Sequence, residues 1–393
     1  MSFLPYFSAE TWTLLALLIT LIVGFTNFDT ECFQKYGRIW GIYDGRQPVL
    51  CIMDKSMIKT ILIKECYNIF TNRRNFHLNG ELFDALSFAE DDTWRRIRSV
   101  LSPSFTSGRL KEKMLKFDML NPLFLLIALF PFTGPILEKM KFSFFPTPSR
   151  VDFLQLMIDS QKGSDTKTGE EQTKGLTDHE ILSQAMIFIF AGYETSSSTL
   201  SFLAYNLATN PHVMTKLQEE IDTVFPNKAP IQYEALMQMD YLDSVLNESL
   251  RLYPVSPRLE RVAQKTVEIN GIVIPKDCVV MVPTWTLHRD PEIWSDPEEF
   301  KPERFSKENK ESIDPYTYMP FGAGPRNCIG MRFALIIIKL AMVEILQSFT
   351  FSILLEMDSQ FLLMPKRPIK LRLEPRSNTP SNTTTTSLKS PNT

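Results

Sequence analysis

One short loop near the C-terminal end limits what this chain can fold into more than any other stretch. It runs from Pro320 to Gly330 (PFGAGPRNCIG) and leads directly into an apolar helical pattern over residues 331–346. Three glycines and a proline within nine residues force an irregular backbone, and Cys328 lies where the next helix presents unpaired N–H groups. Because a helix N-terminus lowers the pKa of a nearby thiol, we expect Cys328 to be an anionic ligand, with Phe321 packed over the sulfur. The plainer alternative is a glycine turn that holds a buried cysteine.

The composition narrows the kind of site. The cysteines occur singly, without any C-x-x-C pair, which argues against a disulfide framework, a zinc site or an iron–sulfur cluster but leaves a single thiolate ligand. The histidines show no metal-ligand spacing, and we interpret each as an ordinary surface or helix residue. A net charge of −3 offers no basic surplus for phosphates, so we expect no nucleic-acid partner. The cysteines are Cys32, Cys51, Cys66, Cys278 and Cys328, and the histidines are His77, His179, His212 and His288.

The loop also resembles a known signature. Its residues from 321 to 330 fit the pattern F-x-x-G-x-R-x-C-x-G, which is similar to the haem-ligand signature of the cytochrome P450 superfamily. The residue sequence of the loop is most similar to that of family three, subfamily A, of vertebrates. The resemblance to the family extends from residue 28 to about residue 376. The resemblance implies a mainly α fold with small β-sheets (α+β), haem (iron protoporphyrin IX) as the cofactor, and Cys328 as its axial thiolate ligand.

The longest helical pattern covers residues 176–210 and begins with a capping box at Thr177 and Glu180. Its middle reads AGYET, which places Gly192 inside a helix at a cost of ~1 kcal/mol relative to alanine. A flat group could approach the helix at this glycine. Taken alone, the segment is best interpreted as a polar seam in a buried helix.

Glu194 and Thr195 follow this glycine and form a carboxylate–hydroxyl pair that can relay protons. The serines at 196–198 are expected to loosen the helix by bonding back to its carbonyls. The stretch resembles the family's A/G-G-x-E/D-T motif, which implies that Glu194 and Thr195 deliver protons to O2. By family position Ser87, Phe188 and Phe190 are candidate substrate contacts, although a phenylalanine on a helix is more often plain core.

A predicted helix over residues 91–100 places Trp94 and Arg98 one turn apart on the same face. A packed tryptophan beside a solvated arginine would be the ordinary explanation. The resemblance gives the pair a role, because haem carries two propionates and arginine offers a rigid bidentate fork to carboxylates. The implied propionate partners are Arg73, Trp94, Arg98, Arg261 and Arg326.

Glu248 and Arg251 lie three residues apart in a predicted helix over residues 240–253. Alone, such a pair is most often a surface ion pair worth a few tenths of a kcal/mol. Together with Arg304 in the downstream sequence PERF, it resembles the family's E-x-x-R and P-E-R-F elements. The resemblance implies that Glu248, Arg251 and Arg304 lock the ligand loop against its supporting helix.

Turn residues and periodicity predict the smaller elements. Residues 28–74 alternate between helix and strand, with a strand at 49–53 and a helix at 56–63. Residues 267–275 contain an Asn-Gly pair and predict a β-hairpin. Residues 362–373 resemble the last sheet of the family.

The two ends of the chain fall outside the expected catalytic domain, residues 27–375. Residues 11–25 are apolar and uncharged but reach only ~23 Å as a helix, short of the ~30 Å hydrocarbon core. A buried N-terminal helix is the alternative to a membrane anchor. The resemblance favours an anchor over residues 1–26 in the endoplasmic reticulum membrane, with the catalytic domain in the cytosol. Residues 376–393 are rich in Ser, Thr, Asn and Pro and are expected to be a disordered tail.

Three joins depart from the family pattern, near residues 26, 113 and 150. The second join removes two helices that would cover the central helix and the helix after Cys328. We therefore expect exposed apolar faces over residues 181–190 and 333–346. The third join removes a helix from the roof of the substrate cavity.

The resemblance implies an unspecific monooxygenase that hydroxylates apolar substrates such as steroids and xenobiotics. It would use O2 and electrons from an NADPH-cytochrome reductase, with a cytochrome b-type protein as a further donor. The alternative is a non-catalytic, truncated splice or gene-model product that binds haem poorly or not at all. An isomerase of the same fold is disfavoured by the Glu194–Thr195 pair.

Overall fold

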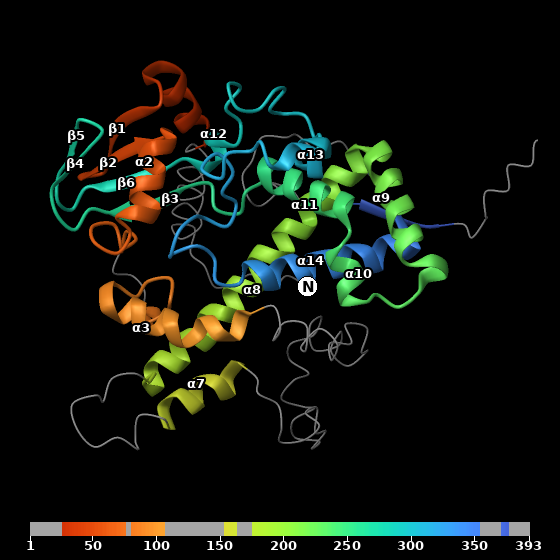
Figure 1. Ribbon diagram of the computed structural model, residues 1–393, viewed down its shortest axis with the longest axis horizontal. Coiled ribbons are helices and arrows are strands. Elements are labelled where there is room, and N and C mark those ends of the chain that lie inside the picture. The colour runs from red at the N-terminus through yellow and green to blue at the C-terminus, as the bar shows by residue number, and fades with distance from the viewer. Residues whose placement is uncertain (1–25, 76–79, 107–152, 163–174, 354–370, 377–393) are drawn as a thin grey trace, which may run out of the picture.

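The computed structural model describes residues 26–75, 80–106, 153–162, 175–353 and 371–376. Most helices gather on one side of the molecule and the largest sheet lies on the other (Figure 1). This arrangement confirms the mainly α class with small β-sheets. The longer helices are α3 (Asp91–Leu101), α7 (Phe153–Lys162), α8 (Asp178–Thr209), α9 (Pro211–Val224), α11 (Asp240–Leu252) and α14 (Met331–Ser348). Shorter helices are α2 (Lys55–Lys59), α10 (Tyr233–Met237), α12 (Thr284–Leu287) and α13 (Lys307–Lys310).

The largest sheet has the strand order β1-β2-β6-β3. The β2–β6 pair is parallel and the two outer pairs are antiparallel. All four residues of β6 are buried, as expected for a central strand covered on both faces. The strands of this sheet are β1 (Ile39–Asp44), β2 (Gln47–Ile52), β3 (Leu259–Val262) and β6 (Val279–Val282).

Two further pairs of strands complete the β structure. The predicted Asn-Gly hairpin is confirmed as β4 (Val267–Ile269) and β5 (Ile272–Ile274), with positive φ at both Asn270 and Gly271. The last sheet pairs β7 (Phe349–Ile353) with β8 (Leu371–Pro375). Residues 354–370, which include part of the stretch predicted for this sheet, lie outside the described residues.

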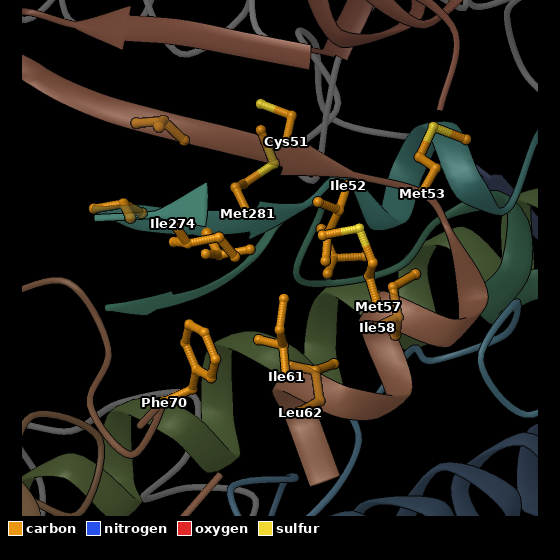
Figure 2. Close-up of a cluster of buried hydrophobic side chains, with 14 of the residues drawn as sticks. Cys51, Ile52, Met53, Met57, Ile58, Ile61, Leu62, Phe70, Ile274 and Met281 are labelled. Carbon is orange, nitrogen blue, oxygen red and sulfur yellow. The ribbon is translucent and has the colours of Figure 1, made fainter. Parts of the chain in front are cut away.

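One hydrophobic core lies between the four-stranded sheet and α2. Figure 2 shows Met57 and Ile58 from α2, with Ile61 and Leu62 from the turn that follows, directed toward side chains of the strands. That turn, Thr60–Lys64, is π-helical, with Glu65 N–H donating to the Thr60 carbonyl at 2.8 Å. The core thus fixes α2 and its π-turn against the sheet.

A second core joins α8, α9, α11 and α14. Helix α8 begins with the predicted capping box, since Thr177 and Glu180 each bond the other's backbone N–H. In Figure 1, α8 runs through the molecule from α7 and α3 at one end to α9 at the other. Helix α8 therefore connects the α3 and α7 region with the core that it forms with α9, α11 and α14.

The expectation of exposed apolar faces is correct for α8 and mostly wrong for α14. On α8, Leu182, Ile189, Phe190 and Tyr193 are between 52% and 73% exposed. The apolar residues of α14 other than Phe333 are buried or half-buried instead, because this helix packs against α8, α9, α10 and β7. Only its first turn presents a large exposed apolar side chain among the described residues, Phe333, at 39%.

The expected anchor and tail lie almost wholly outside the described residues, as do the joins near 113 and 150. Among the residues that the structure does describe, no helix is both long and apolar enough to cross a membrane.

The loop before α14 is seated directly on the π-turn. Gly324 has φ +72°, and a Cβ placed on it would lie 2.0 Å from the Leu62 carbonyl oxygen. Gly322 also has positive φ, and its N–H donates to the Met319 carbonyl at 3.0 Å. Gly324 thus allows the loop to approach the backbone of its neighbour more closely than any residue with a side chain could.

We predict that Gly324→Ala destabilises the protein by at least about 2 kcal/mol, because it combines a left-handed backbone conformation with a clash against backbone. The measurement is the midpoint of chemical unfolding. Gly330→Ala is the matched control in the same loop, where a Cβ meets nothing within 4 Å and φ is −86°. The control should cost at most about 1 kcal/mol, the size of a lost N-cap preference. Equal losses in the two variants would show that the contact with Leu62 is not the cause.

Candidate active site

Cys328 is held at the end of its loop by main-chain hydrogen bonds. Its N–H donates to the Phe321 carbonyl at 2.9 Å, and the Asn327 N–H donates to the Gly324 carbonyl at 3.0 Å. Helix α14 begins three residues later, with Gly330 at its N-cap. Of the five cysteines in the sequence, all of them described, only Cys328 is exposed.

Cys328 faces a cavity of about 710 Å³. The cavity is lined by residues of α3, α8, β3 and the cysteine loop, and it includes most of the predicted site residues. Those that line it are Arg73, Ser87, Trp94, Arg98, Phe188, Thr195, Arg261, Phe321, Arg326 and Cys328. Sequence positions more than 200 residues apart are therefore brought to one chamber.

Phe190 and Glu194 do not line this cavity. Successive α-helical residues are rotated by about 100°, so Phe190 faces away from the side on which Phe188 meets the cavity. Phe190 is 65% exposed, and Glu194 is exposed beside the cavity-lining Thr195. The predicted substrate contact at Phe190 therefore finds no place in this chamber.

The pKa of the Cys328 thiol is shifted in the direction opposite to the one expected. Enclosure by protein raises its pKa, and the opposing effects of the Gly330 N–H and of Arg98 and Arg73 are smaller. The side chain is accessible from the cavity, yet the surrounding protein excludes much of the bulk water. The predicted lowering by the helix N-terminus is thus wrong for the free thiol. A bound metal cation would deprotonate it regardless, because coordination stabilises the thiolate.

The cavity wall is strongly cationic. Arg73, Arg98, Arg261 and Arg326 line it, and within the described residues none of the four forms an ion pair with a carboxylate. Two further lining arginines are neutralised, since Arg74 pairs with Asp44 and Arg258 pairs with Asp29. The first four arginines form what we call the arginine wall.

Two members of the arginine wall carry buried donors without partners. The Nε atoms of Arg261 and Arg326 make no hydrogen bond, although both side chains are almost wholly buried. Burial, together with the charges of Arg73 and Arg261, lowers the pKa of Arg326 to about 9. Burial and the charge of Arg73 likewise lower the pKa of Arg261 to about 10. The arginine wall therefore lowers the stability of the protein when no anion is bound, and it suits an anionic ligand.

The remaining contacts of the arginine wall fix its geometry. The guanidinium of Arg326 lies 4.4 Å from the centre of the Trp94 ring, and its Nη2 donates to the Ala89 carbonyl at 2.6 Å. Arg98 donates to both the carbonyl and the side-chain oxygen of Asn327, each at 2.9 Å. Arg98 thus grips the residue next to Cys328, a role that its helical spacing from Trp94 did not reveal.

The α8 segment beside the cavity is continuous helix. The Thr195 hydroxyl donates to the Ala191 carbonyl at 2.5 Å, and the Ser197 hydroxyl donates to the Glu194 carbonyl at 3.1 Å. These bonds confirm that hydroxyls return to helix carbonyls, but the helix is not broken there. Gly192 lines the cavity, and a Cβ placed on it would meet nothing within 4 Å. The helix surface at this glycine is therefore open to a flat ligand.

The predicted structural triad is brought together. Arg251 and Glu248 are fully buried and joined by two hydrogen bonds of 2.7 and 2.8 Å. Arg304 donates from Nε to Glu248 at 3.2 Å. This buried network lies behind the cysteine loop and is not a surface ion pair.

Sequence reasoning missed one residue of this network. His288 is fully buried, so its interpretation as an ordinary surface or helix residue is wrong. Both ring nitrogens are engaged, one with the Arg251 carbonyl and one with the Met319 N–H. A single histidine in the stretch LHRDP carries no spacing signal, so only the tertiary structure shows its position.

Comparison with known proteins decides the family. The family model described as Cytochrome P450 matches residues 9–118 and 127–373. The chain belongs to the cytochrome P450 family. It is 71% identical to Cytochrome P450 3A27 of Oncorhynchus mykiss over 517 aligned positions, covering 100% of both chains. It is 55% identical to Cytochrome P450 3A40 of Oryzias latipes, covering 95% of this chain and 98% of that one.

A mammalian relative agrees with this subfamily. The chain is 43% identical to Cytochrome P450 3A5 of Homo sapiens, covering 96% of this chain and 99% of that one. The resemblance to subfamily 3A is thereby confirmed. Cytochrome P450 proteins are haem-binding oxidoreductases of the monooxygenase type, and the chain is placed in that class.

The site of this cytochrome P450 suits haem. A flat macrocycle with two propionates needs one axial ligand, cations for the carboxylates and an open helix face. Cys328, the orphaned donors of Arg261 and Arg326, and the open surface at Gly192 meet these three requirements. The residues present therefore fit the cofactor that the family implies.

We predict that Arg261→Met stabilises the haem-free protein by about 1 kcal/mol or more but speeds the loss of bound haem. The change removes a buried cation that lacks a carboxylate partner, and apolar replacements of buried charges are often stabilising. Thermal unfolding without haem and the rate of haem release measure the two effects. Arg258→Met is the control, because it breaks an existing pair with Asp29 at 2.7 Å and should destabilise the haem-free protein. Loss of stability in Arg261→Met would contradict the cost assigned to the arginine wall.

Proposed function

We propose that this chain inserts one oxygen atom of O2 into apolar substrates such as steroids and xenobiotics. The other oxygen atom leaves as water, so each turnover consumes two electrons and two protons. The electrons come from NADPH through a cytochrome reductase, with a cytochrome b-type protein as a further donor. The observation that carries the proposal is the exposed thiol of Cys328 in a chamber walled by arginines without carboxylate partners.

Each residue of the site then has a defined role. Haem, when bound, would supply the redox chemistry with O2, and a thiolate ligand would donate electron density to its iron. Cys328 is that ligand, while Arg73, Arg98, Arg261 and Arg326, with Trp94 stacked on Arg326, hold the propionates. The Phe321 carbonyl accepts a hydrogen bond from the Cys328 N–H, and Phe321 lines the cavity. Electrostatic positioning of the cofactor is therefore separated from ligation.

Protons and substrate would enter on the α8 side. Thr195 lines the cavity, and because its hydroxyl hydrogen is directed to the Ala191 carbonyl, its oxygen can accept a hydrogen bond from the cavity side. Exposed Glu194 adjoins it and can exchange protons with solvent. Phe188 and Ser87 line the same chamber and supply an apolar and a polar contact for substrate. We assign proton delivery to Glu194 and Thr195 and substrate contact to Phe188 and Ser87.

The proposed location is the endoplasmic reticulum membrane, with residues 27–375 in the cytosol. The apolar run over residues 11–25 supports an anchor there. The apolar substrates of the proposed reaction are concentrated in membranes, which suits an anchored enzyme.

The first test is the spectrum of the reduced, carbon monoxide-bound protein. We predict the strongly red-shifted Soret band of thiolate ligation, and its loss in Cys328→Ala. Cys278→Ala is the matched control, because it removes a buried thiol that does not line the cavity. Haem bound without the shifted band in the parent chain would refute the ligand assignment.

The second test concerns proton delivery. We predict that Thr195→Ala lowers the product formed per NADPH consumed by at least about fivefold, since a positioned proton-transfer group contributes ~10²–10⁴-fold to a step. Thr195→Ser should keep most of the coupling. Ser201→Ala removes a hydroxyl from the same helix outside the cavity and should leave coupling unchanged. Unchanged coupling in Thr195→Ala would remove this hydroxyl from the relay.

A non-catalytic product is the second candidate. Two observations favour it: the apolar side chains exposed on α8, and the alignment of 517 positions against a chain of 393 residues, which leaves 124 positions of that alignment without a residue here. Gaps near residues 26, 113 and 150 would account for the difference. Exposed side chains of this size forfeit ~1.5–3 kcal/mol of burial each, against a total stability of ~5–15 kcal/mol.

This second candidate makes its own prediction. The chain as written would be expressed mainly as aggregated or haem-free protein, and restoring family-like helices between Lys113 and Met114 would recover haem incorporation. Size-exclusion chromatography with detection of haem absorbance measures both. A monomeric, haem-loaded protein that melts cooperatively from the unmodified sequence would eliminate this candidate.

A further inference from the structure

His288 links the buried Glu248–Arg251 pair to the loop that carries Cys328. Its Nε2 accepts the Met319 N–H at 3.0 Å, and its Nδ1 lies 3.2 Å from the Arg251 carbonyl oxygen. Because a carbonyl oxygen only accepts, Nδ1 must carry the ring proton, and Nε2 must be the unprotonated nitrogen. Both ring nitrogens are thus used, and the tautomer is set by its partners.

The main chain of His288 strengthens the link. Its carbonyl accepts a hydrogen bond from Nη1 of Arg251 at 2.9 Å, so the two residues are joined in both directions. The ring has no exposed surface. Neither nitrogen can therefore exchange its partner for water without opening the core.

From Met319 the connection continues into the ligand loop. The Met319 carbonyl accepts the Gly322 N–H at 3.0 Å, and the Phe321 carbonyl accepts the Cys328 N–H at 2.9 Å. The preceding residue, Tyr318, is tied to α11 by its hydroxyl, which lies 2.9 Å from the Asn247 carbonyl. The entry to the loop is thus held to α11 through two neighbouring residues, and of these two contacts the one made by His288 is nearer to Cys328 in sequence.

We propose that His288 is a positioning residue for the haem ligand: its ring fixes Met319 relative to Arg251 and thereby sets where Cys328 lies. The proposal rests on the proposed function, because it takes Cys328 as the ligand. It adds to the Glu248, Arg251 and Arg304 network a member that connects this network by a direct hydrogen bond to Met319, the residue before the loop.

Three variants of the full chain test it. His288→Leu removes both hydrogen bonds at similar size, and His288→Gln offers one acceptor and one N–H donor in place of the ring nitrogens. Trp294→Phe is the matched control, since Trp294 is buried in the same cluster but its Nε1 donates only to the Leu287 carbonyl, at 3.2 Å. Haem content and the thermal midpoint are measured for each.

The spectroscopic readout is the rate at which the carbon monoxide complex loses the red-shifted Soret band of thiolate ligation. We expect His288→Leu to lose it at least roughly tenfold faster than the parent while retaining haem, the size of effect for a lost buried hydrogen bond and an orphaned donor. We expect His288→Gln to stay within about threefold of the parent, and Trp294→Phe to match it. A general loss of packing would give no rescue by glutamine.

Hydrogen exchange of the peptide covering residues 320–330 gives a second readout that does not depend on haem. Faster exchange in His288→Leu, but not in Trp294→Phe, supports the positioning role. If the parent chain lacks the thiolate band while this exchange pattern holds, the proposed function fails and the positioning role stands. Unchanged exchange and band stability in His288→Leu, or equal changes in Trp294→Phe, overturn the proposal.

Discussion

The buried pair of Glu248 and Arg251 is the contact on which the segment between α12 and the cysteine loop depends. All five N–H groups of Arg251 are used: two meet the Glu248 carboxylate and three meet main-chain carbonyls of residues 288, 297 and 299. Glu248 in turn accepts the Lys301 N–H and the Arg304 Nε. Because both side chains are wholly buried, removal of either one would leave an uncompensated charge at a cost of ~3–5 kcal/mol. The segment between α12 and the cysteine loop, which has little regular structure, is held by this one guanidinium.

The arginine wall follows the opposite design. Two of its guanidinium groups, those of Arg261 and Arg326, are buried and keep unpaired donors, and the charges of Arg73 and Arg261 act on Arg326. These unpaired donors favour an anionic ligand at the arginine wall, whereas the hydrogen bonds of the Glu248 network are complete within the protein. Placing the satisfied network behind the loop and the unsatisfied one in front of it allows Cys328 to be held before the cofactor arrives. Preorganisation of this kind places the cost in folding instead of in binding.

Sequence patterns predicted the elements whose signals are local. The capping box at Thr177, the Asn270–Gly271 turn and the positions of α3, α11 and α14 depend on neighbours within a few residues. The first two are confirmed, and the helices end within two residues of their predicted bounds. The predictions that were wrong and the contacts that were missed depend on tertiary structure. His288 meets Met319 across 31 residues and Arg98 meets Asn327 across 229, and neither pair has a spacing that a sequence reveals. The thiol pKa of Cys328 was predicted with the wrong sign because enclosure by distant residues outweighs the nearby helix end.

The approach of Gly324 to the Leu62 carbonyl has a consequence for how this sequence can vary over evolutionary time. The partner atom belongs to the main chain, so no replacement of the residue at position 62 moves it away or makes it smaller. The side chain of Leu62 answers to a different demand, since it packs in the core beneath the sheet. A mutation at position 324 therefore cannot be compensated by a change in the identity of the residue it strikes. The two positions touch, yet they should vary independently in related sequences, and co-variation would fail to detect the contact.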